Sequence, residues 1–166
     1  MPSSLLNLSL ELSHWQQLGL AFLLGSFAVA TLSDLRRQSA QREFLEVWLL
    51  FLAAVLVFDV LQVRGQRVEW YIPALKWALL VVFSAVSWRG SGLLFRLALG
   101  DMAALAAAAS LLSPALVVIF YVVAKVLALL LGPLLARGRP SWPFMPVVGL
   151  ATLAVLAIGL IVGQAF

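Results

Sequence analysis

The sequence predicts an all-α membrane protein, a bundle of six transmembrane helices with both termini on the extracytoplasmic side. Of its 166 residues, 64% are hydrophobic and only 11% are charged, whereas soluble domains carry about 25% charged residues. The mean hydropathy is +1.08, and long apolar runs follow one another with only short polar breaks. We therefore expect a single membrane-embedded domain over residues 1–166, with the lipid bilayer as its surroundings.

The apolar runs are expected to be helices because each is close to the roughly 20 residues that a helix needs to cross a bilayer. Strands are disfavoured, since unpaired backbone groups are not tolerated in hydrocarbon and the runs lack the alternation of a barrel. The expected helices cover residues 15–33, 44–62, 71–88, 93–112, 114–135 and 143–164.

The first apolar run is expected to be an anchor that is not cleaved. A secretory signal has a basic segment before its apolar part, but residues 1–17 contain no Lys or Arg, and Arg36 and Arg37 follow the run. Residues 1–14 would then form a short extracytoplasmic segment.

Positive charge sets the expected orientation, because cytoplasmic loops are enriched in Lys and Arg. Two arginines, Arg64 and Arg67, lie on the side that we assign to the exterior of the cell. Seven lie on the side that we assign to the cytoplasm, namely Arg36, Arg37, Arg42, Arg89, Arg96, Arg137 and Arg139.

The same charge distribution argues against nucleic acid as a partner. The net charge is +4 and the pI is 10.4, but the basic residues lie in short loops rather than on one amphipathic face. The chain has no cysteine and a single histidine, His14, which disfavours zinc sites and cysteine nucleophiles. We expect no metal and no cofactor.

Two acids stand out because polar groups in lipid are functional candidates. Asp101 follows Gly100 inside an apolar run, and it is either an N-cap of the Ala-rich helix that follows or a catalytic group, two roles that are compatible. Asp34 ends the first helix, where it is either a juxtamembrane acid paired with Arg36 or Arg37, or a catalytic group.

The expected topology brings Asp34 and Asp101 to the cytoplasmic face, since the first helix ends there and the fourth begins there. Two carboxylates close together in a poorly hydrated site share one proton. One can then take a proton from water while the other polarises a carbonyl, which is aspartic-peptidase chemistry. A Ser/Lys dyad using Lys125 stays open, although no serine is marked out as its partner.

Three short motifs, in order, resemble the prepilin peptidase family of GxGD-type membrane aspartic peptidases, which includes the archaeal preflagellin (prearchaellin) peptidases. The family has an Asp followed by basic residues after the first helix, Gly-x-Gly-Asp at the fourth, and Pro-Phe-Gly-Pro at the last. The matching segments are Asp34-Leu35-Arg36-Arg37, Ala98-Leu99-Gly100-Asp101 and Pro143-Phe144-Met145-Pro146. The likeness extends from about Ala21 to Phe166.

The resemblance implies an endopeptidase of a prokaryotic, archaeal-type plasma membrane, with Asp34 and Asp101 catalytic and Gly100 and Ala98 supporting the catalytic loop. Its substrates would be type IV prepilin-like or prearchaellin precursors, cleaved after a short basic leader at the cytoplasmic face. Ala98 replaces the first Gly of the family motif, and the Ile-Pro-Asn that usually follows the basic cluster is absent. Ala103 stands where bacterial members often have Lys, as in archaeal members, and we expect peptidase activity without methyltransferase activity.

Two further hypotheses concern charged residues near these motifs. Glu43 or Glu46, at the inner start of the second helix, is expected to attract the basic leader. Lys125 lies at the centre of the fifth helix, where a charge needs a partner, and an ion pair with Asp59 is preferred over a place in the catalytic cavity.

Two other functions remain open. A small proton-coupled transporter or channel would use Asp34, Asp101, Asp59 and Lys125 as a relay. A catalytically inactive member of the family could instead serve as an assembly subunit.

Overall fold

The described part of the chain is entirely helical apart from short connections. This computed structural model describes residues 13–37, 42–65, 67–88, 93–136 and 143–165, which contain one isolated β-bridge between Trp88 and Leu97 and no strand. The all-α prediction is confirmed for these residues. The six helices are α1 (His14–Arg37), α2 (Arg42–Arg64), α3 (Tyr71–Ser87), α4 (Leu99–Ser110), α5 (Pro114–Ala136) and α6 (Met145–Ala165).

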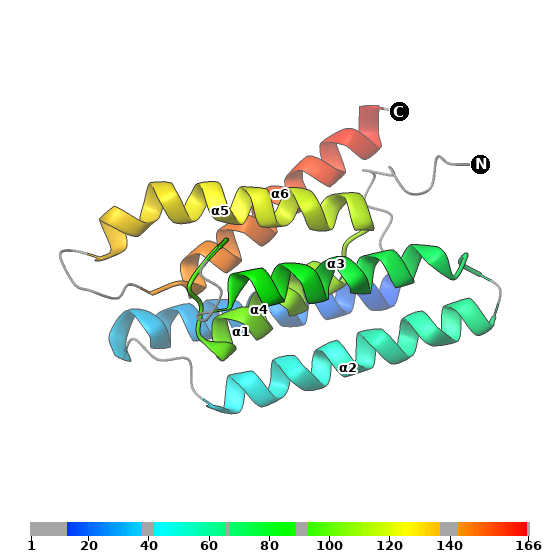
Figure 1. Ribbon diagram of the computed structural model, residues 1–166, viewed down its shortest axis with the longest axis horizontal. Coiled ribbons are helices and arrows are strands. Elements are labelled where there is room, and N and C mark those ends of the chain that lie inside the picture. The colour runs from blue at the N-terminus through cyan, green and yellow to red at the C-terminus, as the bar shows by residue number, and fades with distance from the viewer. Residues whose placement is uncertain (1–12, 38–41, 66, 89–92, 137–142, 166) are drawn as a thin grey trace.

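Successive helices run in opposite directions (Figure 1). The start of α1 and the end of α6 lie at one end of the bundle, which we call the outer end; α2 and α4 also end there. The end of α1 and the start of α4 lie at the opposite, inner end. The expected N-terminal segment, residues 1–14, falls almost wholly outside the described residues, which begin with Ser13.

Two of the helix starts have clear sequence signals. Ser13 and Gln16 form a capping box before α1: the Ser13 amide donates to Gln16 Oε1 at 2.9 Å, and the Gln16 amide donates to Ser13 Oγ at 3.4 Å. Ser113 caps α5 by accepting from the Leu116 amide at 3.4 Å, and Pro114 occupies the first helical position, where its missing amide hydrogen costs nothing.

Among the described residues, four helices are long and apolar enough to cross a membrane, in agreement with the prediction of a membrane protein. They span His14–Ser33, Phe44–Arg64, Pro114–Ala136 and Met145–Val162, while α3 and α4 are shorter apolar helices. The predicted fourth helix is wrong at its start, since residues 93–98 are not helical. The 12 residues of α4 give a length of about 18 Å, well short of the roughly 30 Å of a hydrocarbon core.

Helix α4 can be short because it lies in the middle of the bundle. It contacts all five other helices, and eight consecutive residues, Ala103 to Ser110, are buried. Its alanines let the neighbouring backbones approach closely, as small residues do in membrane bundles. The surrounding helices instead carry the exposed apolar side chains expected of a lipid-facing surface, among them Leu50, Val57, Val81, Leu129, Leu134 and Ile161.

Candidate functional site

Asp101 lies in the first turn of α4, at its third residue. The cap position belongs to Ala98, which has extended backbone angles (φ −73°, ψ 163°) and makes no side-chain capping bond. Asp101 is therefore not the N-cap that the sequence allowed, although a carboxylate in the first turn still interacts favourably with the positive end of the helix dipole. Gly100, immediately before it, is half-buried.

Asp34 lies three residues before the end of α1, and its side chain is outside the described part of the chain. The pairing of α1 with α4 nevertheless fixes its level. A Cβ atom at Gly19 would lie 4.0 Å from Leu111 Cδ2, so the first part of α1 lies beside the end of α4. From this contact, helix rise places Asp34 ~22 Å along α1 and Asp101 ~15 Å back along α4. Both acids thus lie towards the inner end of the bundle.

A short non-helical segment leads into this site. We call Leu93–Ala98 the α3–α4 strap. Its backbone is fixed to the end of α3 by two hydrogen bonds, from the Leu94 amide to the Val86 carbonyl and from the Leu97 amide to the Ser87 carbonyl, both 3.1 Å. Within a membrane such backbone is tolerated only where protein shelters it, and Phe95 and Leu97 are buried accordingly.

Lys125 contacts this strap rather than Asp59, so the preferred ion pair between Asp59 and Lys125 is wrong. The Lys125 ammonium donates a hydrogen bond to the Leu94 carbonyl. It also lies 5.2 Å from the centre of the Phe95 ring, within the range of a cation–π interaction.

The position of Lys125 shows how deeply the strap enters the bundle. Eleven residues of α5 follow Lys125, which corresponds to ~16 Å of helix on its inner side. The Cα–Cβ bond of a helical residue tilts towards the N-terminus of its helix, so the Lys125 side chain leaves α5 in the direction of the outer end. Figure 1 likewise shows the last turns of α1 and α5 extending beyond the start of α4. The start of α4 is recessed.

The third family-like motif packs against the strap. Phe144 and Met145 are buried, and the Phe144 carbonyl accepts hydrogen bonds from the Val147 and Val148 amides in the first turn of α6. The Phe144 ring meets the Phe95 ring edge to face, with centroids 5.5 Å apart. Residues 143–146 therefore pack on the strap that leads into the second motif, residues 98–101.

The two glutamates of the leader hypothesis lie in the first turns of α2, at its inner end. Glu46 is exposed, whereas the side chain of Glu43 is outside the described part of the chain. Within the described residues, no group of three or more His, Asp or Glu side chains is placed to hold a metal ion.

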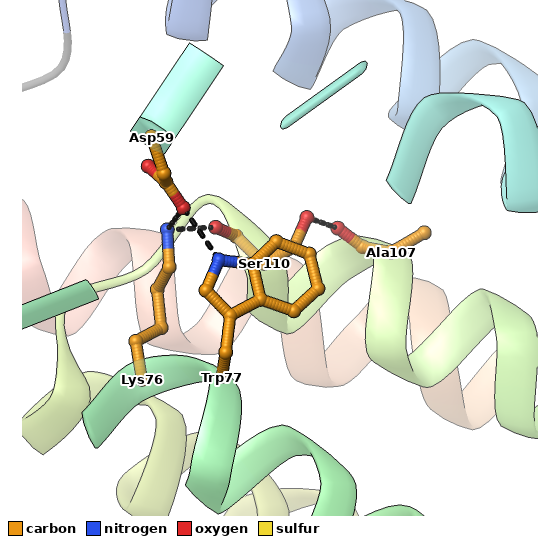
Figure 2. A network of polar contacts seen from close by, with 5 residues as sticks. All are labelled: Asp59, Lys76, Trp77, Ala107 and Ser110. Carbon is orange, nitrogen blue, oxygen red and sulfur yellow. Dashed lines mark hydrogen bonds and ion pairs between the residues drawn. The ribbon is translucent and has the colours of Figure 1, made fainter. Parts of the chain in front are cut away.

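A separate polar cluster lies at the outer end (Figure 2). Lys76 Nζ is 2.5 Å from Asp59 Oδ2 and donates to the Ser110 carbonyl at 3.0 Å. Trp77 Nε1 donates to the same carboxylate oxygen at 2.7 Å, and Ser110 Oγ donates to the Ala107 carbonyl at 2.8 Å. This cluster joins the end of α2, the start of α3 and the last turn of α4.

Sequence reasoning missed this pair, but spacing alone contains the signal. Asp59 lies five residues before the end of α2 and Lys76 five residues after the start of α3. Two antiparallel helices joined by a short connection bring such positions to the same depth. Counting equal numbers of residues back along α2 and forward along α3 from their connection would have selected Lys76, not Lys125, as the partner of Asp59.

Comparison with known proteins identified no relative of this chain. No protein-family model matches the chain, and neither a curated protein nor a solved structure matches it.

Proposed function

We propose that the chain is a membrane aspartic endopeptidase that removes the short basic leader of type IV prepilin-like or prearchaellin precursors. Asp34 and Asp101 form its catalytic pair, supported by Ala98 and Gly100 at the start of α4. The motif order and spacing in the sequence suggest the substrate class, and the arrangement of the helices supports the pairing of the two acids.

The observation that carries the proposal is the antiparallel packing of α1 against α4. Gly19 lies beside Leu111, so the chain segments that carry the two acids run towards the same end of the bundle. Asp101 lies in the first turn of a buried helix, behind a strap that enters the protein to the level of Lys125. Asp101 is only partly exposed, and limited hydration of a carboxylate favours sharing of a proton with a second acid.

The chemistry follows from two carboxyl groups that hold one proton between them. The ionised group takes a proton from a water molecule as the water oxygen attacks the scissile carbonyl carbon, and the protonated group donates to the carbonyl oxygen. The resulting tetrahedral intermediate collapses when the amide nitrogen receives a proton and the C–N bond breaks. No cofactor takes part in these steps.

The proposal includes a multi-pass location in a prokaryotic, archaeal-type plasma membrane, with six membrane-embedded helices, both termini extracytoplasmic and the inner end in the cytoplasm. Seven arginines on the inner side against two on the outer side support this orientation. A precursor with a basic leader would then meet the inner end first, where Glu43 and Glu46 lie in the first turns of α2.

The transporter alternative has less support. A proton relay needs a polar path through the bundle, but α4 contains only Met, Ala and Leu between Asp101 and Ser110. In addition, Asp59 pairs with Lys76 at the outer end, not with Lys125.

The experiment that tests the proposal is co-expression with a prepilin or a prearchaellin, followed by measurement of leader cleavage. Wild-type protein should cleave, and Asp34→Asn and Asp101→Asn should each abolish cleavage while the protein stays folded. Glu69→Gln, the same chemical change at an exposed carboxylate before α3, is the matched control and should cleave normally. Normal cleavage by either Asn variant would refute the assignment, and a wild-type protein inert towards both substrates would favour the assembly-subunit reading.

A further inference from the structure

The α3–α4 strap is attached to three different helices within a few residues. Its backbone is hydrogen-bonded to α3 through Leu94 and Leu97. Its Phe95 side chain packs on Phe144 at the start of α6, and Lys125 of α5 donates to the Leu94 carbonyl. Three residues after the strap ends, the chain reaches Asp101.

Lys125 is the charged member of this set of contacts. Its ammonium serves two adjacent strap residues, since it donates to one carbonyl and lies 5.2 Å from the centre of the neighbouring ring. A hydrogen bond from a charged donor is roughly twice as strong as a neutral one, and an ammonium in the middle of a membrane helix is costly without partners. Both effects hold the strap against α5.

One polar side-chain atom of α3 lies close to the strap without contributing to its attachment. Ser87 Oγ is buried and has no hydrogen-bond partner among the described residues. Phe83 stacks on Tyr121 with ring centroids 4.5 Å apart, and α3 and α5 run in the same direction. Ser87 and Lys125 each lie four residues, about one turn, further along, so they share a level in the bundle. The Ser87 hydroxyl thus lies near the strap but makes no hydrogen bond to it.

We infer that Lys125 is a positioning residue: by holding the Leu94 carbonyl and the Phe95 ring, it fixes the entry of the chain into α4 and thereby the place of Asp101. The consequence for cleavage depends on the proposed catalytic role of Asp101, but the attachment of the strap does not. A displacement of about 1 Å at a reacting group can lower a rate ~100-fold. Loss of the Lys125 contact should therefore lower kcat much more than it changes KM.

The test combines leader cleavage with a distance measurement that needs no activity. Because the chain has no cysteine, Leu93→Cys and Leu160→Cys introduce two unique spin-label sites at exposed positions, one on the strap and one near the outer end of α6. The distance distribution between the labels reports the attachment of the strap. It is measured in bilayer nanodiscs for the parent protein and for Lys125→Met, Lys125→Arg and Ser87→Ala.

Lys125→Met keeps an apolar chain of similar length but removes the donor and the charge. It should broaden the distance distribution and lower kcat ~100-fold, with KM changed about twofold or less. Lys125→Arg should restore a narrow distribution and most of kcat. Ser87→Ala, which removes a buried hydroxyl without a partner, should match the parent in both measurements.

A narrow distribution and normal kcat in Lys125→Met would overturn the inference, and so would a broad distribution with unchanged kcat. An equal loss in Ser87→Ala would also overturn it, because the effect would then be one of general packing. If the parent protein does not cleave, or cleaves without Asp101, the proposed function fails while the distance measurement still tests the attachment of the strap.

Discussion

The two ends of α4 are both held by a lysine from a neighbouring helix, but in different ways. At the outer end, Lys76 donates to the Ser110 carbonyl and is neutralised by Asp59, whose carboxylate also accepts from Trp77. Towards the inner end, Lys125 donates to a strap carbonyl and lies over an aromatic ring. The outer cluster is a closed set of charges suited to stability, whereas the inner contact holds a segment that leads directly to a candidate catalytic acid.

Removal of one partner from the outer cluster is expected to give the largest loss of stability. Asp59→Asn leaves the Lys76 ammonium buried without its counter-charge, which should cost about 3–5 kcal/mol. The measurement is the free energy of unfolding in detergent, and replacement of both partners with Asp59→Leu and Lys76→Met should recover much of the loss.

The same variant tests whether the two ends are functionally separate. Cleavage per folded molecule of Asp59→Asn should equal that of the wild type, because the change lies at the end of α4 away from Asp101. If this variant kept its stability but lost cleavage, the separation of a structural outer end from a functional inner end would be wrong.

A smaller loss is expected from enlarging a small buried side chain of α4 itself, near its outer end. Ala107 is 0% exposed, and overpacking a filled core costs about 1–3 kcal/mol. Ala107→Leu should lower the unfolding free energy by that amount, while Ala157→Leu on the exposed face of α6 should change it little. If both substitutions changed the unfolding free energy by the same small amount, α4 would not be enclosed by the other helices as described.

The smallest expected effect concerns recruitment of the leader at the inner end. Combined Glu43→Gln and Glu46→Gln should raise KM for a basic-leader substrate about fivefold and leave kcat nearly unchanged, because exposed charges mainly affect encounter and orientation. The difference from wild type should shrink at high ionic strength, where the charges are screened. Unchanged processing with unchanged salt dependence would remove both glutamates from the account.

Much of the fold follows from hydropathy, because lipid requires long apolar helices. Five of the six expected helices agree with the structure to within a few residues. The fourth does not, because hydropathy cannot distinguish apolar residues that cross lipid from those buried inside protein. Leu94, Phe95 and Leu97 read as the start of a spanning helix, yet they form a strap sheltered by neighbouring helices.

The candidate site was less accessible to sequence reasoning, since it depends on pairs of residues that only packing brings together. Motifs single out Asp34 and Asp101, and alternation of the helices gives their common end. The choice of Lys125 as the partner of Asp59 was wrong because it matched charges without comparing depths. The contact between Lys125 and the Leu94 carbonyl has no sequence signature. Every residue has a backbone carbonyl, so the sequence does not indicate which one accepts the hydrogen bond.

Direct proximity of positions 34 and 101 is the most decisive measurement. In this cysteine-free chain, Asp34→Cys combined with Asp101→Cys should be joined by a short bifunctional thiol reagent in the membrane. The control pair, Asp34→Cys with Asp59→Cys, has its thiols at opposite ends and should react without becoming linked. If both thiols at positions 34 and 101 are modified singly but never become linked, the two acids do not meet, and the aspartic-peptidase account is wrong.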